Sequence, residues 1–363
     1  MGTATINRAE AFAYRIPTDG PEADGTLRWD STTIVIARVY GGSERGLGYT
    51  YGQAEAAGLI RTKLAEVVNG CDVMAVAGSH QAMVRAVRNI GRPGLVSMAI
   101  SAVDIALWDL KARCLGLSLA TLLGEIRPAI PVYGSGGFTS YSVERLQNQL
   151  SGWVNDGIGR VKMKVGSQPE ADLARIRAAR QAIGPDAELF VDANGAYDRK
   201  QALCKAKDFA DFGVQWFEEP VSSDDLAGLR LLRDRAPPGM EVTAGEYGPD
   251  LVYFRRMLEA GAVDVLQPDA TRCGGITGFM RAGILCQAFE LPLSAHTAPS
   301  IHAHPCCALP KARHVEYFHD HVRIESMLFD GAQVAVRGCV RPDPSRPGLG
   351  LELREKDAAR YAV

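Results

Sequence analysis

The sequence predicts an α/β protein whose larger part is a (β/α)-barrel and whose first third is a separate α+β domain. The main observation is a ladder of short apolar runs, each ending in a charged or polar residue. The runs recur about every 20–28 residues, the length of one strand plus one helix. Their terminal residues are Lys164, Asp192, Glu218, Glu246, Asp269, His296 and Glu316. Because the C-terminal ends of barrel strands meet on one face, we expect these seven side chains to share one pocket.

The first part of the chain does not follow this period. Residues 4–16, 32–40 and 46–53 have the alternating or β-branched character of strands. The polar segment 17–31 contains Gly and Pro, which predicts a long mobile loop. Apolar residues at three- and four-residue steps predict a helix over 95–116. Three strands followed by helices therefore predict an α+β domain ahead of the barrel.

The period also stops near the end of the chain. Residues 325–350 are turn-rich and short-stranded, and they do not continue the strand–helix alternation. We expect this segment to pack back on the N-terminal domain and on the barrel rim. The predicted division is 1–127 for the α+β domain, 128–324 for the barrel and 325–363 for the returning segment.

Composition excludes several classes of function. The chain has 363 residues, a net charge of −2 and 23% charged residues, without a basic patch that would predict nucleic-acid binding. No apolar stretch reaches 18 residues without charges, so no transmembrane helix is expected. Residues 1–17 lack the apolar core of a signal peptide. The eight cysteines form no C-x-x-C pair, which predicts reduced core cysteines in a cytoplasmic protein.

Three acids of the ladder predict a metal site. Asp192, Glu218 and Glu246 end three successive strands, which lie about 4.8 Å apart in a sheet. Carboxylates that close repel one another unless a cation lies between them. Ligation by oxygen alone suits a hard divalent ion, so Mg²⁺ is the first expectation and Mn²⁺ the second.

With these residues in place, the sequence resembles the enolase superfamily, mandelate racemase subgroup. The residues that carry the resemblance are the K-x-K of Lys162 and Lys164, the acids Asp192, Glu218 and Glu246, the pair Asp269 and His296, and Glu316. The resemblance covers nearly the whole chain. It implies a modified (β/α)₇β TIM-type barrel with an N-terminal α+β capping domain that the C-terminal segment completes. A homo-oligomer is also expected from this resemblance.

The resemblance implies a role for each matching residue. The three acids would bind one Mg²⁺, Lys164 would be a base, and His296, paired with Asp269, would be its counterpart. Glu316 would donate a hydrogen bond to the substrate carboxylate. We expect a raised pKa for Glu316 because other acids lie near it. Lys164 and Lys162 share one strand face, so each should lower the proton affinity of the other.

Further side chains are weaker candidates for substrate contacts. They are Lys162, Asn194, Ser135, Tyr51, Arg28, Trp29 and His321. Asn194 could equally cap a turn. Strand alternation predicts that Glu219, beside Glu218, points the other way and either supports the ligands from behind or serves a structural role.

The reaction expected from this set begins with removal of the proton α to a carboxylate. The preferred hypothesis is an acid-sugar dehydratase, which expels the β-hydroxyl and yields a 2-keto-3-deoxy acid. The alternative is a racemase or epimerase of a 2-hydroxy acid, in which Lys164 and His296 act on opposite faces of one α-carbon. A third class is a non-catalytic barrel, which would not bind Mg²⁺. The expected partner is a small carboxylate, with neither nucleic acid nor membrane.

Overall fold

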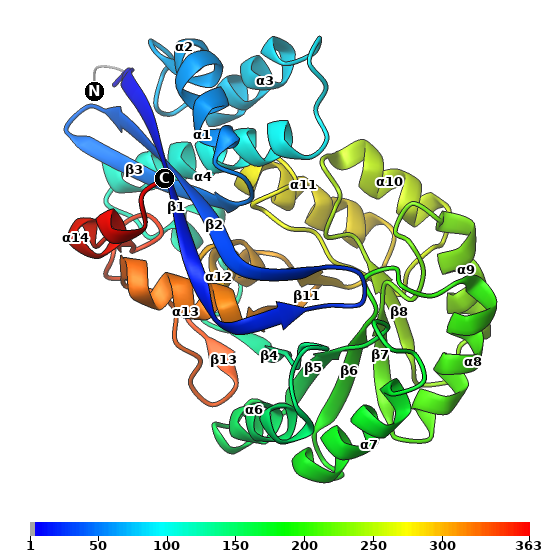
Figure 1. Cartoon of the computed structure of the whole chain (residues 1–363). Helices are drawn as coiled ribbons and strands as arrows, with labels where there is room; N and C mark the ends of the chain where they lie inside the picture. Colours follow the sequence, from blue (N-terminus) through cyan, green and yellow to red (C-terminus); the bar gives the residue numbers. More distant parts are fainter. Residues whose placement is uncertain (1–3) are drawn as a thin grey trace.

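The computed structural model describes residues 4–363 and shows a closed barrel of parallel strands beneath a capping domain (Figure 1). Within these residues eight parallel strands, β4 to β11, pair in chain order, and β11 closes on β4. Their bounds are β4 Ile130–Gly136, β5 Arg160–Lys164, β6 Glu188–Asp192, β7 Val214–Glu218, β8 Glu241–Ala244, β9 Val265–Leu266, β10 Leu293–Ala295 and β11 Ala312–Phe318. The predicted (β/α)₇β barrel is confirmed.

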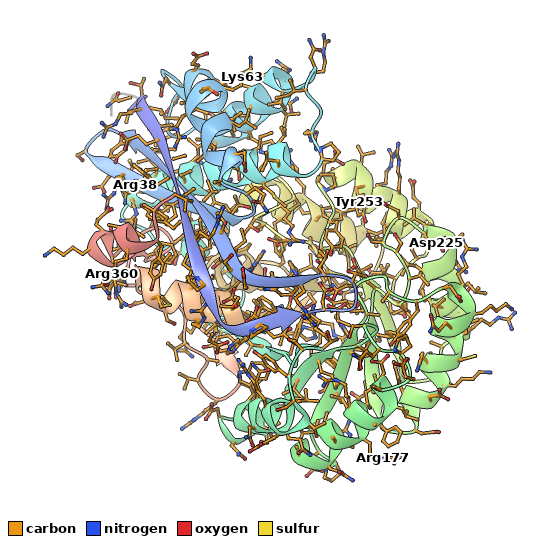
Figure 2. All side chains as sticks on the ribbon, viewed as in Figure 1. Arg38, Lys63, Arg177, Asp225, Tyr253 and Arg360 are labelled. Atoms are coloured by element: carbon orange, nitrogen blue, oxygen red, sulfur yellow. The ribbon has the colours of Figure 1, made fainter. Side chains whose placement is uncertain are left out.

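A helix follows each of the first seven barrel strands and packs on the outside of the barrel (Figure 1). These helices are α6 Val143–Asn155, α7 Asp172–Ile183, α8 Arg199–Ala210, α9 Leu226–Arg235, α10 Leu251–Glu259, α11 Gly275–Ala288 and α12 Pro299–Ala308. The side chains of Asp198, Asp225 and Asp250 accept hydrogen bonds from the first turns of α8, α9 and α10. Such N-caps fix where the loop ends and the helix begins. Asp225 lies on the outer side of the barrel (Figure 2).

The register of the barrel strands sets the level of the functional side chains. Lys164 is paired with Asp192, and Asp192 with Glu218, across three neighbouring strands. Alternation places Lys162 and Lys164 on one face, while Met163 between them is buried in the core under the helices.

The capping domain holds a three-stranded antiparallel sheet and the helices before the barrel. The strands are β1 Ile6–Ala23, β2 Arg28–Gly41 and β3 Glu44–Tyr51. The helices are α1 Glu55–Leu59, the π-helix η1 Ile60–Leu64, α2 Ala65–Val68, α3 Val76–Ala86, α4 Leu95–Cys114 and α5 Leu119–Leu123. Helix α4 packs on β2 and β3, and the core between them is formed by small and branched apolar side chains.

The prediction of a mobile loop over 17–31 is wrong. β1 runs to Ala23 and β2 begins at Arg28, so most of the segment is a two-stranded hairpin in which Pro17 pairs with Ser31 and Glu22 with Trp29. Oδ1 of Asp24 accepts from the backbone nitrogens of Thr26 and Leu27 at 2.6 and 2.7 Å, which closes the turn. The polar composition reflects a hairpin that extends beyond the capping core and over the barrel (Figure 1).

The C-terminal segment contacts both parts of the molecule. Its elements are α13 His319–Leu328, β12 Phe329–Asp330, β13 Cys339–Val340, β14 Glu352–Leu353, α14 Glu355–Ala358 and the 3₁₀ turn η2 Ala359–Tyr361. β13 adds to β4 of the barrel in antiparallel orientation. On the other side, Arg38 of β2 bonds Glu355 of α14 (Figure 2). We propose that the chain divides after residues 127 and 324 into the capping domain, the barrel and the returning segment. The second boundary falls inside helix α13.

The structure bears on two expectations from composition, one about membrane-spanning helices and one about the cysteines. No helix in the part of the chain from residue 4 onward is both long and apolar enough to cross a membrane. All eight cysteines are free thiols, and four of them, Cys273, Cys286, Cys306 and Cys307, are buried. Cys204 is exposed, so the expectation of core cysteines holds for only part of the set.

Candidate active site

Three buried carboxylates form a cluster at the C-terminal end of the barrel strands. One oxygen each of Asp192, Glu218 and Glu246 lies within 4.8 Å of the others. Oε1 of Glu218 and Oε2 of Glu246 are buried and accept no hydrogen bond from residues 4–363. Buried carboxylate oxygens without a partner are costly, and a divalent cation among them would remove that cost. The cluster therefore fits the predicted Mg²⁺ site.

Glu246 reaches the cluster from beyond the end of its strand. β8 ends at Ala244, and Gly245 follows with φ of +138°. A Cβ at Gly245 would lie 3.0 Å from the backbone nitrogen of Gln267, so this bend requires glycine. Asp269 and His296 also lie beyond the regular strands, whereas Glu316 lies inside β11. The expectation that every ladder residue is the last of its strand is thus correct for Lys164, Asp192 and Glu218 only.

The two lysines lie beside the carboxylates at different depths. Nζ of Lys162 is 2.7 Å from Oε2 of Glu218 and 2.8 Å from Oε1 of Glu316. Nζ of Lys164 is 2.5 Å from Oδ2 of Asp192. Lys162 is fully buried, and Lys164 lines the cavity described below. Lys162 is therefore an internal counter-charge, and Lys164 is the lysine that a ligand can reach.

Without a metal ion, the net pKa shifts of Lys164 and Glu316 run opposite to expectation, although Lys162 does lower the pKa of Lys164 as expected. Burial lowers the pKa of Lys164 and Lys162 lowers it further, but Asp192 and the other acids outweigh both and raise it. Burial raises the pKa of Glu316, but Lys162, His296 and Lys164 outweigh burial and hold it well below its usual range. The spacing of acids in the sequence could not show that Lys162 contacts Glu316 directly.

Asp269 and His296 form the predicted pair. Nδ1 of His296 donates to Oδ2 of Asp269 at 2.8 Å, which leaves Nε2 directed at Oε2 of Glu246, 3.3 Å away, and Oε2 of Glu316, 3.8 Å away. Burial lowers the pKa of His296, but Glu246 and Asp269 outweigh burial and raise it. A raised pKa favours the protonated imidazolium, the form that can donate a proton.

Buried polar groups hold Glu316 and the histidine pair in place. Oγ of Ser135 donates to Glu316 at 2.6 Å, and the backbone nitrogen of Thr297 donates to it at 3.1 Å. His302 accepts from the backbone nitrogen of Ala270 and donates from Nδ1 to the carbonyl of Thr297, both at 2.8 Å. His302 thus joins the residues that follow Asp269 and His296. Ser135 was expected to contact the substrate. In the structure it bonds Glu316 and is not among the residues that line the cavity.

A cavity of about 460 Å³ lies between the hairpin and the barrel end. Eight of the predicted site residues line it, namely Lys164, Glu246, His296, Glu316, Asn194, Trp29, Tyr51 and His321. Arg28 does not line it and borders a separate surface hollow with Pro21, Trp29 and Asp30. Trp29 borders both hollows, whereas Arg28 borders only the outer one, so Arg28 as a substrate contact stays a prediction.

Tyr51 and His321 form one wall of the cavity. Their rings stack with centroids 3.4 Å apart and planes inclined by 11°. Oη of Tyr51 and Nδ1 of His321 are buried and have no hydrogen-bond partner within residues 4–363. These unsatisfied polar atoms are suited to substrate hydroxyl groups.

Sequence reasoning did not find twelve further lining residues, among them Arg15, Asp24, Gln53, Tyr247, Arg272 and Thr297. Arg272, three residues after Asp269, bonds Glu246 at 3.1 Å, and its place in a loop after a ladder strand could have indicated it. Arg15 is different, because it lies in the middle of a strand and forms no salt bridge within residues 4–363. Nothing in the local sequence marks it.

Glu219 does not follow strand alternation. β7 ends at Glu218, and Glu219 adopts a left-handed conformation with φ of +39°. Its carboxyl group is buried, and burial followed by the charges of Glu246 and Asp192 raises its pKa well above the usual value. Glu219 therefore lies close enough to the carboxylate cluster for the charges of that cluster to act on it, but it does not line the cavity.

The fold and the cluster define a class: a capped barrel with a metal-binding carboxylate site at the C-terminal ends of its strands. Residues 145–358 match the enolase C-terminal domain-like family, and residues 23–124 match the mandelate racemase/muconate lactonizing enzyme N-terminal domain. The chain belongs to the enolase superfamily, in its mandelate racemase/muconate lactonizing enzyme family.

Known relatives extend over almost the whole chain. A mandelate racemase/muconate lactonizing enzyme-like protein from Rubrobacter xylanophilus is 54% identical, with a TM-score of 0.97 over 99% of this chain and 100% of that structure. The 3,6-anhydro-alpha-L-galactonate cycloisomerase of Streptomyces coelicolor is 31% identical over 99% of both chains. The L-talarate/galactarate dehydratase of Salmonella typhimurium, solved with Mg and L-lyxarohydroxamate, is 28% identical with a TM-score of 0.91 over 100% of this chain and 94% of that structure.

Proposed function

We propose that the protein is a Mg²⁺-dependent dehydratase that converts an acid sugar to a 2-keto-3-deoxy acid. The observation that carries the proposal is one cavity lined by a lysine, a histidine that is paired with a carboxylate, and a carboxylate of the metal-binding cluster. Relatives named as acid-sugar dehydratases and cycloisomerases support the substrate class.

Asp192, Glu218 and Glu246 would hold the Mg²⁺ ion. Bound there, the ion supplies positive charge that stabilises an enediolate and weakens the hold of Asp192 on the Lys164 proton. Oε1 of Glu218 and Oε2 of Glu246 accept no hydrogen bond within residues 4–363, which leaves both oxygens available to a cation. The positive charge of Lys162, which lies between Glu218 and Glu316, offsets part of the repulsion among the buried carboxylates.

Lys164 is the proposed base. Its Nζ removes the proton from the substrate α-carbon, the C–H electron pair moves into the enediolate, and Lys164 becomes an ammonium. Glu316, held by Ser135 and Thr297, would take up a proton from solvent as the negatively charged substrate carboxylate enters beside it, and would then donate a hydrogen bond to that carboxylate. Fixed donors and charges of this kind favour the transition state because they need no reorganisation.

His296 is the proposed acid for the leaving group. Its Nε2 proton passes to the β-hydroxyl, the C–O bond breaks, and water leaves as the enediolate electrons form the enol double bond. The enol then tautomerises to the 2-keto-3-deoxy acid. Asp269 fixes the tautomer of His296 and stabilises its charged form. Asn194, Trp29, Tyr51 and His321 are proposed to contact the sugar hydroxyls.

The experiment that tests the proposal is a screen of mono- and di-acid sugars with Mg²⁺, read by 2-keto acid formation. At least one acid sugar should give a keto acid, and EDTA should stop the reaction until Mg²⁺ is restored. Turnover that persists after thorough chelation would contradict the metal assignment. Failure of every acid sugar, with Mg²⁺ bound, would contradict the substrate class.

The alternative reaction is racemisation or epimerisation of a 2-hydroxy acid. Lys164 and His296 both line the one cavity, so either could exchange a proton with a shared α-carbon. In D₂O this reaction would place deuterium on the α-carbon of both configurations and would form no keto acid. That result would replace the dehydratase proposal and leave the residue assignments unchanged.

A further inference from the structure

A second cluster of metal-ligating side chains lies outside the active-site cavity. Asp19 and Glu22 belong to β1 of the hairpin, and His319 is the first residue of α13, directly after β11. One ligand atom of each lies within 4.8 Å of the others. Nε2 of His319 is 2.9 Å from Oδ2 of Asp19. The cluster therefore joins two parts of the chain about 300 residues apart, at the point where the hairpin meets the barrel.

Glu22 is the member of the cluster without a cationic partner within residues 4–363, and burial, followed by the charge of Asp320, raises its pKa to about 8, so it would hold either a proton or a bound cation at neutral pH. Its side chain is fully buried, with 0% exposure. Trp29 Nε1 donates to Oε2 at 2.8 Å, while Oε1 has no hydrogen-bond partner among residues 4–363. Of the nearby arginines, Arg145 bonds Asp19, and Arg323 bonds Asp320 while its Nε has no hydrogen-bond partner within residues 4–363; neither forms a salt bridge with Glu22 there. A buried carboxylate oxygen in this position is costly unless it binds a cation.

The surrounding contacts orient both carboxylates in the way that metal sites require. Arg145 holds Oδ1 of Asp19 at 2.8 Å, which leaves Oδ2 facing His319. Trp29 holds one oxygen of Glu22 in the same manner and leaves the other free. Outer hydrogen bonds of this kind fix the direction of metal ligands. Ligands about 2.0–2.2 Å from an ion lie roughly 3 Å apart, close to the separation of Asp19 and His319.

We propose that Asp19, Glu22 and His319 bind a Zn²⁺-class transition-metal ion at a site distinct from the catalytic carboxylate cluster. Two carboxylates and one imidazole form a mixed oxygen and nitrogen ligand set with room for water. Such a set favours transition metals, whereas the all-oxygen catalytic cluster suits Mg²⁺. The ion would tie the hairpin, which carries cavity residues such as Trp29, to the end of the barrel. This inference is independent of the reaction proposed above.

Zinc stoichiometry tests the site directly. EDTA-treated, dialysed protein is titrated with Zn²⁺ by calorimetry, and bound metal is counted after gel filtration. Because Zn²⁺ also occupies carboxylate sites, wild type should bind two equivalents per chain. His319→Ala and Glu22→Gln should each bind one. The matched control Asp30→Asn, an exposed acid of the same hairpin, should keep two.

A spectroscopic readout separates lost coordination from lost folding. Co²⁺ bound at the hairpin site should give a visible absorption band that His319→Ala lacks, while the circular dichroism spectrum stays unchanged. Should Glu22→Gln fail to fold because Glu22 is buried, Asp19→Asn, which is more exposed, replaces it and should also lose one equivalent. A single equivalent in wild type, or two equivalents retained in His319→Ala, would overturn the proposal.

Discussion

At the scale of single residues, the charge states in the cavity depend on direct contacts between side chains from different strands. The ladder located Lys164, His296 and Glu316, and all three line one cavity. Their protonation depends on atoms a few ångströms away, such as Lys162 Nζ beside Glu316, which no spacing along the chain specifies. Residue types at strand ends are visible in a sequence, whereas local charge balance requires the folded contacts.

The proposed division of labour between Lys164 and His296 predicts separable defects. In His296→Asn the acid for the leaving hydroxyl is absent, while Lys164 and the carboxylates remain. This variant should still exchange the substrate α-proton with D₂O, followed by NMR, but should form no keto acid. Lys164→Ala should lose both exchange and turnover. Exchange kept in Lys164→Ala and lost in His296→Asn would instead assign the base to His296.

We predict that Arg15 gives the enzyme a preference for substrates that carry a second carboxylate. It lines the cavity without a salt-bridge partner, whereas Lys164, Arg272 and His296 each contact a carboxylate of the protein. Arg15→Gln should raise KM for a six-carbon di-acid sugar about tenfold, because an exposed charge-assisted hydrogen bond contributes about 1.5 kcal/mol. KM for the matching mono-acid should change little. Arg28→Gln, which alters the outer face of the hairpin, is the control.

Equal changes in KM for the di-acid sugar and the mono-acid, or no change for either, would show that Arg15 does not bind a distal carboxylate. That outcome would leave the dehydratase proposal intact, because turnover itself would still be observed.

At the scale of elements, the barrel was predictable and the hairpin was not. Each strand–helix unit from β5 to β10 carries one polar or charged side chain at the end of its strand or within three residues after it, so the period survives differences in loop length. The two strands of the hairpin over residues 17–31 pair locally, but the contacts that hold the hairpin on the barrel are long-range, such as the hydrogen bond from Ser140 to the carbonyl of Pro21. The segment therefore forms strands although its Gly, Pro and polar residues are typical of a loop.

The turn of the hairpin contains a glycine whose replacement should impair catalysis more than stability. A Cβ at Gly25 would lie 2.2 Å from the carbonyl oxygen of Ala193 and 2.7 Å from that of Val165, both in loops at the barrel mouth. Gly25→Ala should lift the turn and displace Asp24 and Trp29, which line the cavity. We expect kcat/KM to fall about tenfold or more, since a 1 Å misplacement can cost about 100-fold.

The melting temperature of Gly25→Ala should change by only a few degrees, because the turn lies outside both apolar cores. Gly152→Ala is the control, since a Cβ there meets no atom within 4 Å. Unchanged kinetics in Gly25→Ala would show that the turn does not position the cavity wall.

At the scale of the whole molecule, buried polar side chains join the capping domain to the barrel. Glu325 of α13 accepts from Oη of Tyr49 on β3 at 2.7 Å and from Oγ of Ser300 on α12 at 2.6 Å. Asp109 of α4 accepts from the backbone nitrogens of Leu47 and Leu349 at 2.7 and 2.6 Å, which ties in the C-terminal segment. The sequence predicted that the last segment returns, but it did not show which residues hold it.

Glu325 predicts that stability falls as pH rises through the weakly acidic range. Burial raises its pKa from 4.5 to about 7, although Ser300 and Tyr49 oppose the shift. Between these values the folded protein holds a proton that the unfolded chain has released, so raising the pH favours unfolding. A shift of about 2.5 units corresponds to a loss on the order of 3 kcal/mol by pH 8. Glu325→Gln cannot ionise and should not suffer this loss.

The measurement is the free energy of unfolding in urea at pH 5 and pH 8 for wild type and Glu325→Gln. Comparing the two proteins removes the contribution of every other titrating group, provided that their unfolding slopes agree. Between pH 5 and pH 8 the free energy of unfolding of wild type should fall more than that of Glu325→Gln. A difference that stays constant with pH would show that Glu325 does not change its protonation on unfolding, and the junction would then contribute through packing and hydrogen bonds alone.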